Sequence, residues 1–459
     1  MIFTDLYGPI YRNLVFPFYD SVLRRRTTWS HYRKISPLPW APADELEKMR
    51  KERLNRLLEY CGTRVPFYRN LFREKGLDLS RGIEDIRILA DKGITVTKED
   101  LREKPDEFIS DDYRKEDLVQ NWTSGSTGVP TDLYKTMDTW CMRMAIKMRS
   151  EDWIGKRPGT PSAMIWGQKA HLGPMARIKQ QLYWNFQNYR FLPSIDLKEN
   201  VLTGYISKIK RYGAKYIESY VYPVYLMAEI IEKKGIEPPR LDGIVTGAER
   251  LIDFQKEKIE SVFGCPVYNR YGTSELTNIS CECEQHNGQH INIDTLWVET
   301  VNDDDDPVLN EEGEVIVTDL MNYAMPLIRY RTDDIAVMSD RRCDCGRTFP
   351  MFETVLGKEL QNIKAPDGHE WHWKILQWNL YGVEGVFRYQ FVERADDHFE
   401  IRIIPTGEVG LEEIREKILK SFSEMTSHGV LLTVEFVEDI PLGGRSKMNF
   451  FISEKEGQA

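Results

Sequence analysis

Long apolar runs are missing from this chain of 459 residues, and the segment nearest to one lies at residues 1–26. Its sequence, MIFTDLYGPIYRNLVFPFYDSVLRRR, is interrupted by Asp5, Arg12 and Asp20. A signal peptide or a membrane span needs an uninterrupted apolar core, so we expect no transmembrane segment and a cytoplasmic protein. With three arginines at its end, the segment either packs on the main domain or makes peripheral contact with a membrane surface; its uneven polar face favours packing.

An excess of positive charge is also missing. The formal net charge is -10, from 62 Lys and Arg against 72 Asp and Glu. A general nucleic-acid binder needs clustered basic residues, so we expect no nucleic-acid partner and favour small molecules. The composition, 41% hydrophobic and 11% aromatic, excludes a disordered chain, and the length exceeds what one hydrophobic core usually supports.

Cysteine is too scarce for a disulfide framework. Seven cysteines, an odd number in so long a chain, fit a reducing compartment. Four of them nevertheless fall in two Cys-x-Cys pairs, one at Cys281 and Cys283 and the other at Cys343 and Cys345.

The order of the remaining patterns predicts an α/β protein of two domains. Residues 45–75 carry apolar side chains at helical spacing, and short apolar runs then alternate with helices as far as about residue 275, which is typical of βαβ units in a parallel sheet. Beyond residue 290 the sequence is strand-rich, which predicts a β-rich subdomain within a large domain at 1–356. Residues 357–459 have the pattern of a small α+β domain.

Strand ends are where a parallel sheet binds ligands, and one hydroxyl-rich segment lies among the candidate loops. TSGSTGVPT, residues 123–131, combines glycines with serine and threonine hydroxyls. It suits either a phosphate cradle or a plain flexible loop. It is not a Walker A loop, because the required glycine-to-lysine spacing fails.

Three further motifs are each ambiguous alone. NRYGTSE, residues 269–275, offers a tyrosine for base stacking, a threonine for a phosphate and a glutamate for magnesium, although a turn with a core tyrosine is the simpler interpretation. Asp334, in YRTDD, suits the hydroxyls of a ribose or a solvated turn. Lys447 lies in a glycine-bearing loop, where a surface charge is usual.

Taken in order, these segments resemble the adenylate-forming superfamily of acyl-CoA synthetases, peptide-synthetase adenylation domains and luciferases. The resemblance is strongest to the branch of phenylacetate-CoA ligase-like and capsule-biosynthesis enzymes, and it covers nearly the whole chain. It rests on TSGSTGVPT, TGAE (residues 246–249), YGTSE (271–275), YRTDD (330–334) and Lys447. It implies a large α/β N-terminal domain and a small, mobile C-terminal domain that carries the catalytic lysine.

The resemblance also implies a role for each matched residue, with ATP and Mg²⁺ as cofactors. The residues implied to hold the β- and γ-phosphates are Ser124, Gly125, Ser126, Thr127 and Gly128. Those implied to surround adenine are Gly247, Ala248, Glu249, Tyr271 and Gly272, with the tyrosine stacked on the base. Thr273 would contact the α-phosphate, Glu275 the magnesium ion and Asp334 the ribose. Lys447 would neutralise charge that develops between the attacking carboxylate and the α-phosphate.

The implied activity is that of an ATP-dependent ligase. It would activate a carboxylic acid as acyl-AMP, release pyrophosphate and pass the acyl group to a thiol such as coenzyme A. The alternatives are an AMP-forming amide or ester ligase, or an adenylyltransferase, acting on a small molecule or polysaccharide precursor without coenzyme A, and a non-catalytic member. The aromatic stretches at 164–171 and 219–225 suit either a pocket for a ring-bearing or apolar acid or the core.

Three features depart from the pattern of the superfamily. Asp333 stands where glycine is usual, a change that aspartate tolerates better than most residues. The hinge motif is GKELQ, with Lys358 in place of arginine and Gln361 in place of aspartate, which puts hinge movement and the second half-reaction in question. Ser446 replaces the glycine that usually precedes the catalytic lysine.

The cysteine pairs and two nearby histidines predict a structural zinc site. Zinc in such sites takes four nitrogen or sulfur ligands. The set we favour is Cys283, His286, Cys343 and Cys345, with Cys281 and His290 as substitutes. Such a site would join the loop after Glu275 to the strand region after Asp334. Reduced cysteines without a metal are the alternative.

Overall fold

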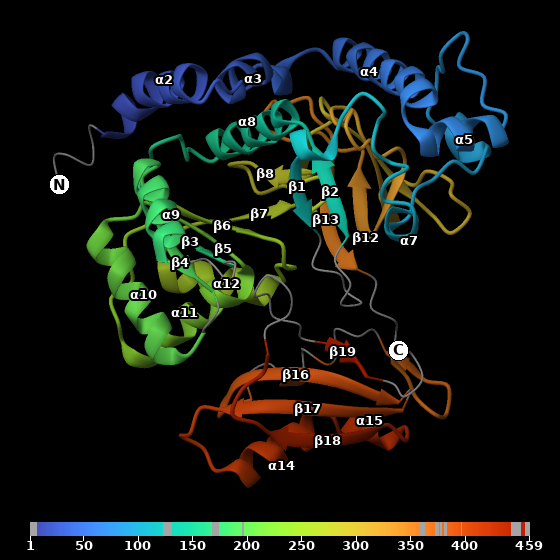
Figure 1. Cartoon of the computed structure of the whole chain (residues 1–459). Coiled ribbons are helices and arrows are strands. Elements are labelled where there is room, and N and C mark those ends of the chain that lie inside the picture. Colours follow the sequence, from blue (N-terminus) through green and yellow to red (C-terminus); the bar gives the residue numbers. More distant parts are fainter. Residues whose placement is uncertain are drawn as a thin grey trace. The chain divides into compact units, whose positions relative to one another are not determined.

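The computed structural model divides the chain into two compact units, Met1–Lys358 and Glu359–Ala459 (Figure 1). It describes residues 7–122, 131–167, 174–194, 197–358, 363–371, 376, 379–380, 383–395, 397–441 and 451–454.

The first unit opens with helices. Residues 7–23 form a helical segment in which two π-helical turns, η1 (Tyr11–Val15) and η2 (Tyr19–Leu23), flank α2 (Phe16–Phe18). The helices and 3-10 turns that follow are α3 (Thr28–Ile35), η3 (Leu38–Trp40), α4 (Ala43–Arg64), α5 (Pro66–Glu74), α6 (Arg87–Asp91), α7 (Lys98–Glu103) and η4 (Lys115–Asp117). Helix α4 stops at Val65, which is extended at φ -112° and ψ 113°, because a proline disfavours helical geometry in the residue before it.

A mixed sheet of eleven strands, counted over the described residues, forms the body of this unit. Its order is β10-β11-β12-β13-β9-β8-β7-β6-β5-β3-β4. The parallel half comprises β3 (Ser162–Trp166), β4 (Tyr189–Pro193), β5 (Tyr216–Ser219), β6 (Gly243–Gly247) and β7 (Val267–Tyr271). The connecting helices are α9 (Pro174–Phe186), α10 (Glu199–Tyr212), α11 (Val221–Lys234) and α12 (Asp253–Phe263). The predicted βαβ units are thus confirmed.

The strand-rich region continues the same sheet in antiparallel fashion. Its strands are β8 (Ser280–Glu282), β9 (Gln289–Ile291), β10 (Leu296–Val301), β11 (Glu312–Asp319), β12 (Tyr330–Ser339) and β13 (Met351–Lys358). Strand β8 joins the two halves, because Cys281 pairs with Arg270 of β7. A core that includes Leu57 and Phe72 of the opening helices together with Val315 and Phe352 of the sheet fixes this half against α4 and α5.

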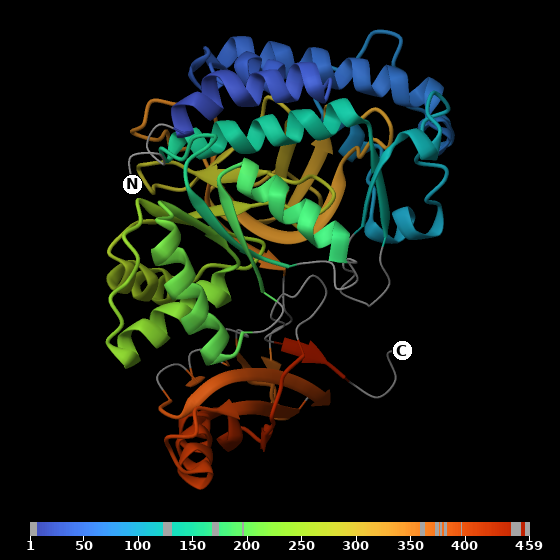
Figure 2. The ribbon, with the colours of Figure 1, turned by 60° about the vertical axis from the view of Figure 1, so that its left-hand side comes forward.

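Two smaller elements complete the first unit. Strands β1 (Val119–Trp122) and β2 (Asp132–Lys135) pair as an antiparallel ladder, and α8 (Met137–Trp153) follows them. Helix α8 begins at Thr136, whose side chain accepts a hydrogen bond from the backbone N–H of Thr139, a common helix N-cap. Figure 2 shows α8 beneath the opening helices, along one side of the unit.

The second unit is an α+β fold, as the sequence predicted. Its elements are β14 (Ile363–Lys364), β15 (Glu370–Trp371), β16 (Val386–Ala395), β17 (His398–Pro405), α14 (Leu411–Ser421), α15 (Ser423–Ser427), β18 (Leu431–Phe436) and β19 (Phe451–Ser453). Four of the strands form one sheet in the order β18-β17-β16-β19. Ile414 and Ile418 of α14 pack with Ile401 and Ile403 of β17 in its core.

No helix among the described residues combines the length and the apolar character needed to cross a bilayer.

Candidate active site

Three sequence motifs meet along one edge of the large sheet. Strands β6 and β7 are parallel neighbours, with Gly247 opposite Arg270. TGAE and YGTSE therefore leave the sheet side by side, at the carboxyl ends of these two strands. The third motif, YRTDD, begins strand β12. It lies four places from β7 in the strand order, yet its side chains reach those of the YGTSE loop.

The closest contact across this edge joins Tyr271 to Asp334. The phenolic hydroxyl of Tyr271 donates to Oδ2 of Asp334 at 2.8 Å and lies 3.5 Å from the hydroxyl of Thr332. Burial raises the pKa of the Asp334 carboxyl to about 6, although the Tyr271 hydrogen bond opposes the shift. The structure thus places an aromatic ring beside a carboxylate whose Oδ1 receives no hydrogen bond from Tyr271.

The loop after Tyr271 folds back tightly on itself. A Cβ added to Gly272 would lie 1.7 Å from the carbonyl oxygen of Thr277, so no side chain fits at that position. The hydroxyl of Thr273 accepts a hydrogen bond from the backbone N–H of Leu276 at 3.2 Å, and its carbonyl accepts one from the N–H of Thr277 at 2.8 Å. Thr273 therefore keeps its hydroxyl proton for another acceptor.

Glu275 is held at its backbone and at its side chain. Arg143 of α8 donates to its carbonyl oxygen at 2.6 Å, and the same guanidinium contacts Asp319 at 2.7 Å. The hydroxyl of Tyr330, at the start of β12, donates to Oε1 of Glu275 at 3.2 Å. The carboxylates of Glu275 and Asp334 are thus linked through neighbouring positions of one strand.

In the TGAE segment, Ala248 has a left-handed backbone conformation and the Glu249 side chain binds the start of α11. Ala248 has φ 65°, in the left-handed region that favours glycine. Glu249 accepts a hydrogen bond from the backbone N–H of Tyr222 at 2.9 Å, in the first turn of α11. A carboxylate stabilises a helix N-terminus, so part of the capacity of Glu249 serves α11 rather than a ligand.

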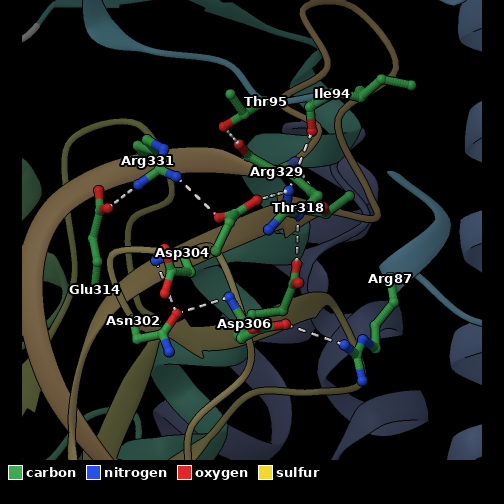
Figure 3. Close-up of polar contacts among 12 residues, drawn as sticks. Arg87, Ile94, Thr95, Asn302, Asp304, Asp306, Glu314, Thr318, Arg329 and Arg331 are labelled. Carbon is green, nitrogen blue, oxygen red and sulfur yellow. Dashed lines mark hydrogen bonds and ion pairs between the residues drawn. The ribbon is translucent and has the colours of Figure 1, made fainter. Parts of the chain in front are cut away.

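The start of β12 depends on a buried ion network that the sequence did not reveal (Figure 3). Arg329 is fully buried with φ 46°. Its guanidinium contacts Asp305 at 2.8 Å and Glu299 at 3.3 Å. Its carbonyl accepts hydrogen bonds from the N–H of Val96 and the hydroxyl of Thr95. Arg331 adds a second contact to Asp305 at 2.9 Å. The acidic run at 303–306 therefore supplies counter-charge at the start of the strand that carries Tyr330 and Asp334.

The hinge residue Lys358 lies close to these motifs. It pairs with Asp334 in the ladder between β12 and β13, and its ammonium lies 3.3 Å from the carboxylate of Asp333. Asp333 has φ 58°, which accounts for the preference for glycine that the resemblance implies at this position.

Several predicted residues lie outside the described part of the chain. They are Ser124, Gly125, Ser126, Thr127, Gly128, Gln361, Ser446, Lys447 and the segment 168–171 of the aromatic stretch.

The rest of the two aromatic stretches meets at strand ends. The rings of Trp166, at the end of β3, and Tyr220, after β5, stack with centroids 4.2 Å apart. Tyr220 is buried, and its hydroxyl accepts a hydrogen bond from the backbone N–H of Gly167 at 3.4 Å. Nearby strand ends carry the buried hydroxyls of Ser194 and Ser219, for which the described residues provide no hydrogen-bond partner.

Four metal-binding side chains converge where β8 and β9 meet the segment before β13. The ligand atoms of Cys283, His290, Cys343 and Cys345 all lie within 4.8 Å of one another. The two sulfur atoms of Cys283 and Cys343 are 3.7 Å apart, and Nε2 of His290 is 3.2 Å from Sγ of Cys345. Three thiols and one imidazole form a donor set that suits zinc.

The structure places the substitute His290, and not the favoured His286, in this group. The ring of His286 stacks on Tyr268 at 4.6 Å, and its Nδ1 lies 3.5 Å from Glu282. Nδ1 of His290 lies 3.1 Å from the carbonyl oxygen of Phe349. A carbonyl can only accept, so Nδ1 carries the proton and Nε2 presents its lone pair to the cysteines.

Comparison with known proteins supports the resemblance. No family model matches the chain. A phenylacetate-coenzyme A ligase from Thermus thermophilus is 29% identical over 391 residues, which cover 82% of this chain and 85% of that protein. Protein CapK from Staphylococcus aureus is 21% identical over 452 residues and covers 97% of each chain. A solved structure of 2-hydroxyisobutyryl-CoA ligase in complex with 2-HIB-AMP has a TM-score of 0.71 at 18% identity, with 90% of each chain covered.

The fold and the order of the site motifs define a member of the adenylate-forming superfamily, as the sequence predicted. Its similarity to a phenylacetate-coenzyme A ligase and to CapK supports the phenylacetate-CoA ligase-like branch of this superfamily.

Proposed function

We propose that this chain is an AMP-forming ligase that activates a carboxylic acid as acyl-AMP and then transfers the acyl group to coenzyme A. The observation that carries the proposal is the pairing of Tyr271 with Asp334, because it sets an aromatic ring that could stack on adenine beside a carboxylate that could accept from ribose hydroxyls. Relatives that are phenylacetate-coenzyme A ligases support it, as does a fold neighbour that holds an acyl adenylate.

In this proposal each described residue acts on one part of the nucleotide. Tyr271 stacks on adenine, and the backbone of Gly247, Ala248 and Gly272 lines the pocket beside it. The free oxygen of Asp334 accepts from the ribose hydroxyls. Thr273 donates its remaining hydroxyl proton to the α-phosphate.

The reaction develops negative charge at one phosphorus atom, and fixed cations stabilise it. Glu275 would hold Mg²⁺, which supplies the Lewis acidity of such sites. Ser124 to Gly128 would donate to the β- and γ-phosphates, and Lys447 would approach the bond that forms. These last assignments rest on the motifs, because their residues lie outside the described part of the chain.

Exchange of labelled pyrophosphate into ATP tests the first half-reaction directly. We expect exchange that depends on an added carboxylic acid, measured across a panel of aromatic and aliphatic acids. The stacked Trp166 and Tyr220 favour ring-bearing or apolar members of the panel. Absence of exchange with every acid, in protein that binds ATP, would contradict the proposal.

A second candidate function differs in the acceptor. The ion pair between Lys358 and Asp333 occupies the hinge region with chemistry unlike the usual arginine and aspartate, and hinge movement governs the second half-reaction. Transfer to an amine or hydroxyl, or of AMP itself, would then replace transfer to coenzyme A. AMP formation that is independent of coenzyme A but requires another acceptor would favour this candidate.

We also propose a structural zinc ion on Cys283, His290, Cys343 and Cys345. The fit of three thiols, one oriented imidazole and a compact geometry supports it. The ion would join the β8–β9 turn to the segment between β12 and β13. Metal analysis after purification without added zinc should find about one zinc per chain, and Cys345→Ser should lower both the zinc content and the Tm. Zinc well below stoichiometry would contradict the site.

The state of the cysteines indicates the cellular compartment in which the protein works. All seven are free thiols in the structure. Free thiols together with a need for ATP support a cytoplasmic location.

A further inference from the structure

The helical segment at residues 7–23 turns an apolar stripe towards solvent. Ile10, Leu14, Phe18 and Val22 are 48%, 67%, 55% and 57% exposed, and they recur every four residues. Monomeric soluble proteins seldom leave so ordered a row of large apolar side chains uncovered.

The helix type keeps these side chains in line. In an α-helix of 3.6 residues per turn, positions four apart drift steadily around the axis. A π-helical turn is wider and opposes that drift. Because η1 and η2 flank α2, the two helix types alternate along the segment and the stripe stays straight.

The opposite face anchors the segment to the protein. Tyr11 is buried there, and its ring lies 5.4 Å from that of Phe186 in α9. Tyr7 donates to the carbonyl of Phe186 at 2.7 Å. The buried Asp20 accepts a hydrogen bond from the N–H of Trp29 at 2.9 Å. The stripe is therefore the outer face of a fixed element.

Helix α9 carries a second exposed stripe. Met175, Ile178 and Leu182 are each more than half exposed and occupy one face of this helix at helical spacing. The two helices touch at Phe186, and Figure 2 shows α9 in green below α8, at the front of the unit. We call the exposed residues of 7–25 and 175–182 together the apolar face.

The charge of this face is distinctive. The exposed positions of the segment 9–25 are Pro9, Ile10, Asn13, Leu14, Phe18, Ser21, Val22, Leu23, Arg24 and Arg25. None is acidic, although the whole chain has a net charge of -10. The only ionised groups among them are the two arginines, which lie where the stripe ends. Arg24 lies over the ring of Tyr19 at 5.6 Å and Arg26 over that of Trp140 at 4.6 Å, but Arg24, like Arg25, stays exposed.

We propose that the apolar face docks on a lipid bilayer that contains anionic headgroups. The stripe would lie in the plane of the interface with its apolar side chains at the acyl boundary, while Arg24 and Arg25 would contact lipid phosphates. The contact is peripheral, since no described helix is able to span a bilayer.

The charge of the apolar face favours an anionic bilayer over a second copy of the chain as its partner. A symmetric partner would offer the same face, with apolar, uncharged polar and basic side chains but no exposed acidic one among its described residues. Arg24 and Arg25 would then find no counter-charge within it. An anionic bilayer satisfies both features of the face, and docking there would bring the activated acid to the membrane surface.

Sedimentation of the full chain with vesicles tests the proposal. We expect binding to vesicles of phosphatidylcholine mixed with phosphatidylglycerol, weaker binding to phosphatidylcholine alone, and weakening of the former by salt. The double variant Leu14→Glu/Phe18→Glu should bind at least about tenfold more weakly, because two buried apolar side chains are lost. Arg24→Gln/Arg25→Gln should lose roughly tenfold on anionic vesicles and little on neutral ones.

The matched control changes two exposed leucines elsewhere, as Leu309→Glu/Leu431→Glu. It alters net charge and apolar surface equally and should bind vesicles like the unchanged chain. Circular dichroism and Tm establish that each variant folds. If Leu14→Glu/Phe18→Glu does not fold, Arg24→Gln/Arg25→Gln still tests the proposal. Failure to bind either vesicle, or equal binding by all variants, would overturn the proposal. So would light scattering that shows the apolar face holding two chains together without lipid.

Discussion

At the scale of single residues, the role proposed for Asp334 predicts that nucleotide binding depends on pH. The ribose hydroxyls donate, so the site needs the ionised carboxylate, and burial raises its pKa to about 6. Above that pH the group is ionised. Below it, protonation competes with ATP, and the Kd for ATP should rise roughly tenfold for each pH unit.

Calorimetric titration of ATP across this range checks the dependence. Asp334→Asn should bind ATP weakly, with a Kd that no longer changes through the titration of this carboxyl. Dividing the wild-type Kd by the Kd of Asp334→Asn at each pH cancels the contribution of the ionisation of ATP itself. Asp333→Asn, at the exposed neighbouring position, should retain the dependence on pH. A wild-type Kd that stays constant from pH 7 to well below the pKa of Asp334, about 6, would refute the role.

Gly272 gives a second prediction at this scale. Its missing side chain admits the carbonyl of Thr277, so Gly272→Ala should destabilise the protein by about 1–3 kcal/mol through a backbone clash and should also weaken ATP binding. Gly204→Ala, in the interior of α10 with open space around it, should be neutral or stabilising by up to about 1 kcal/mol. Thermal unfolding of both variants distinguishes the effects, and equal Tm values would contradict the clash.

Sequence reasoning at this scale succeeded where a residue belongs to a local motif. The motifs singled out Tyr271 and Asp334, and the structure brings the two together. Of the two candidate histidines, the metal group contains His290, the substitute, and not the favoured His286. The register of the β8–β9 ladder determines this, since it sets His290 opposite Cys281. Register depends on pairing between strands, and spacing along the chain does not reveal it.

At the scale of elements, the start of β12 is held by charge buried beneath it. Asp305→Asn removes the carboxylate that Arg329 and Arg331 share, and the cost should be about 1–3 kcal/mol because the Arg329 guanidinium stays buried. The KM for ATP should rise as well, because Tyr330 and Asp334 follow on the same strand.

Asp303→Asn is the matched control, in the same loop and with an exposed side chain. Denaturant unfolding and initial rates measure both effects. If Asp305→Asn loses stability but keeps its KM for ATP, the ion network does not position the residues of the site. Sequence could predict the strands of this region from their alternation. It could not predict the network, because Arg329 and Asp305 are 24 residues apart and meet only after β11 and β12 pair.

At the scale of the whole molecule, catalysis is proposed to need a residue of the second unit. Lys447→Ala should lower the rate of pyrophosphate exchange by on the order of 10²–10³, since a positioned cation stabilises the charge that develops. ATP binding should persist in this variant. Lys420→Ala, on α14 of the same unit, is the control and should exchange at the normal rate. Unchanged exchange in Lys447→Ala would refute the assignment.

The large-scale features were the most predictable. Alternating strands and helices determine a parallel half-sheet, and five ordered motifs identified the superfamily. The continuity of the antiparallel strands with that sheet was not foreseen, because it depends on the single junction between β7 and β8. The acid remains beyond sequence reasoning, because a pocket is shaped by side chains from several strand ends at once.

The hydrogen bond from Tyr222 to Glu249 has a consequence for kinetics. Glu249 follows the backbone proposed to line the adenine pocket. Tyr222 lies in the first turn of α11, two residues after Tyr220, whose ring stacks on Trp166. Ordering either end of this link orders the other. The two substrates should therefore bind with synergy, and linkage requires ATP to tighten the acid by the same factor as the acid tightens ATP.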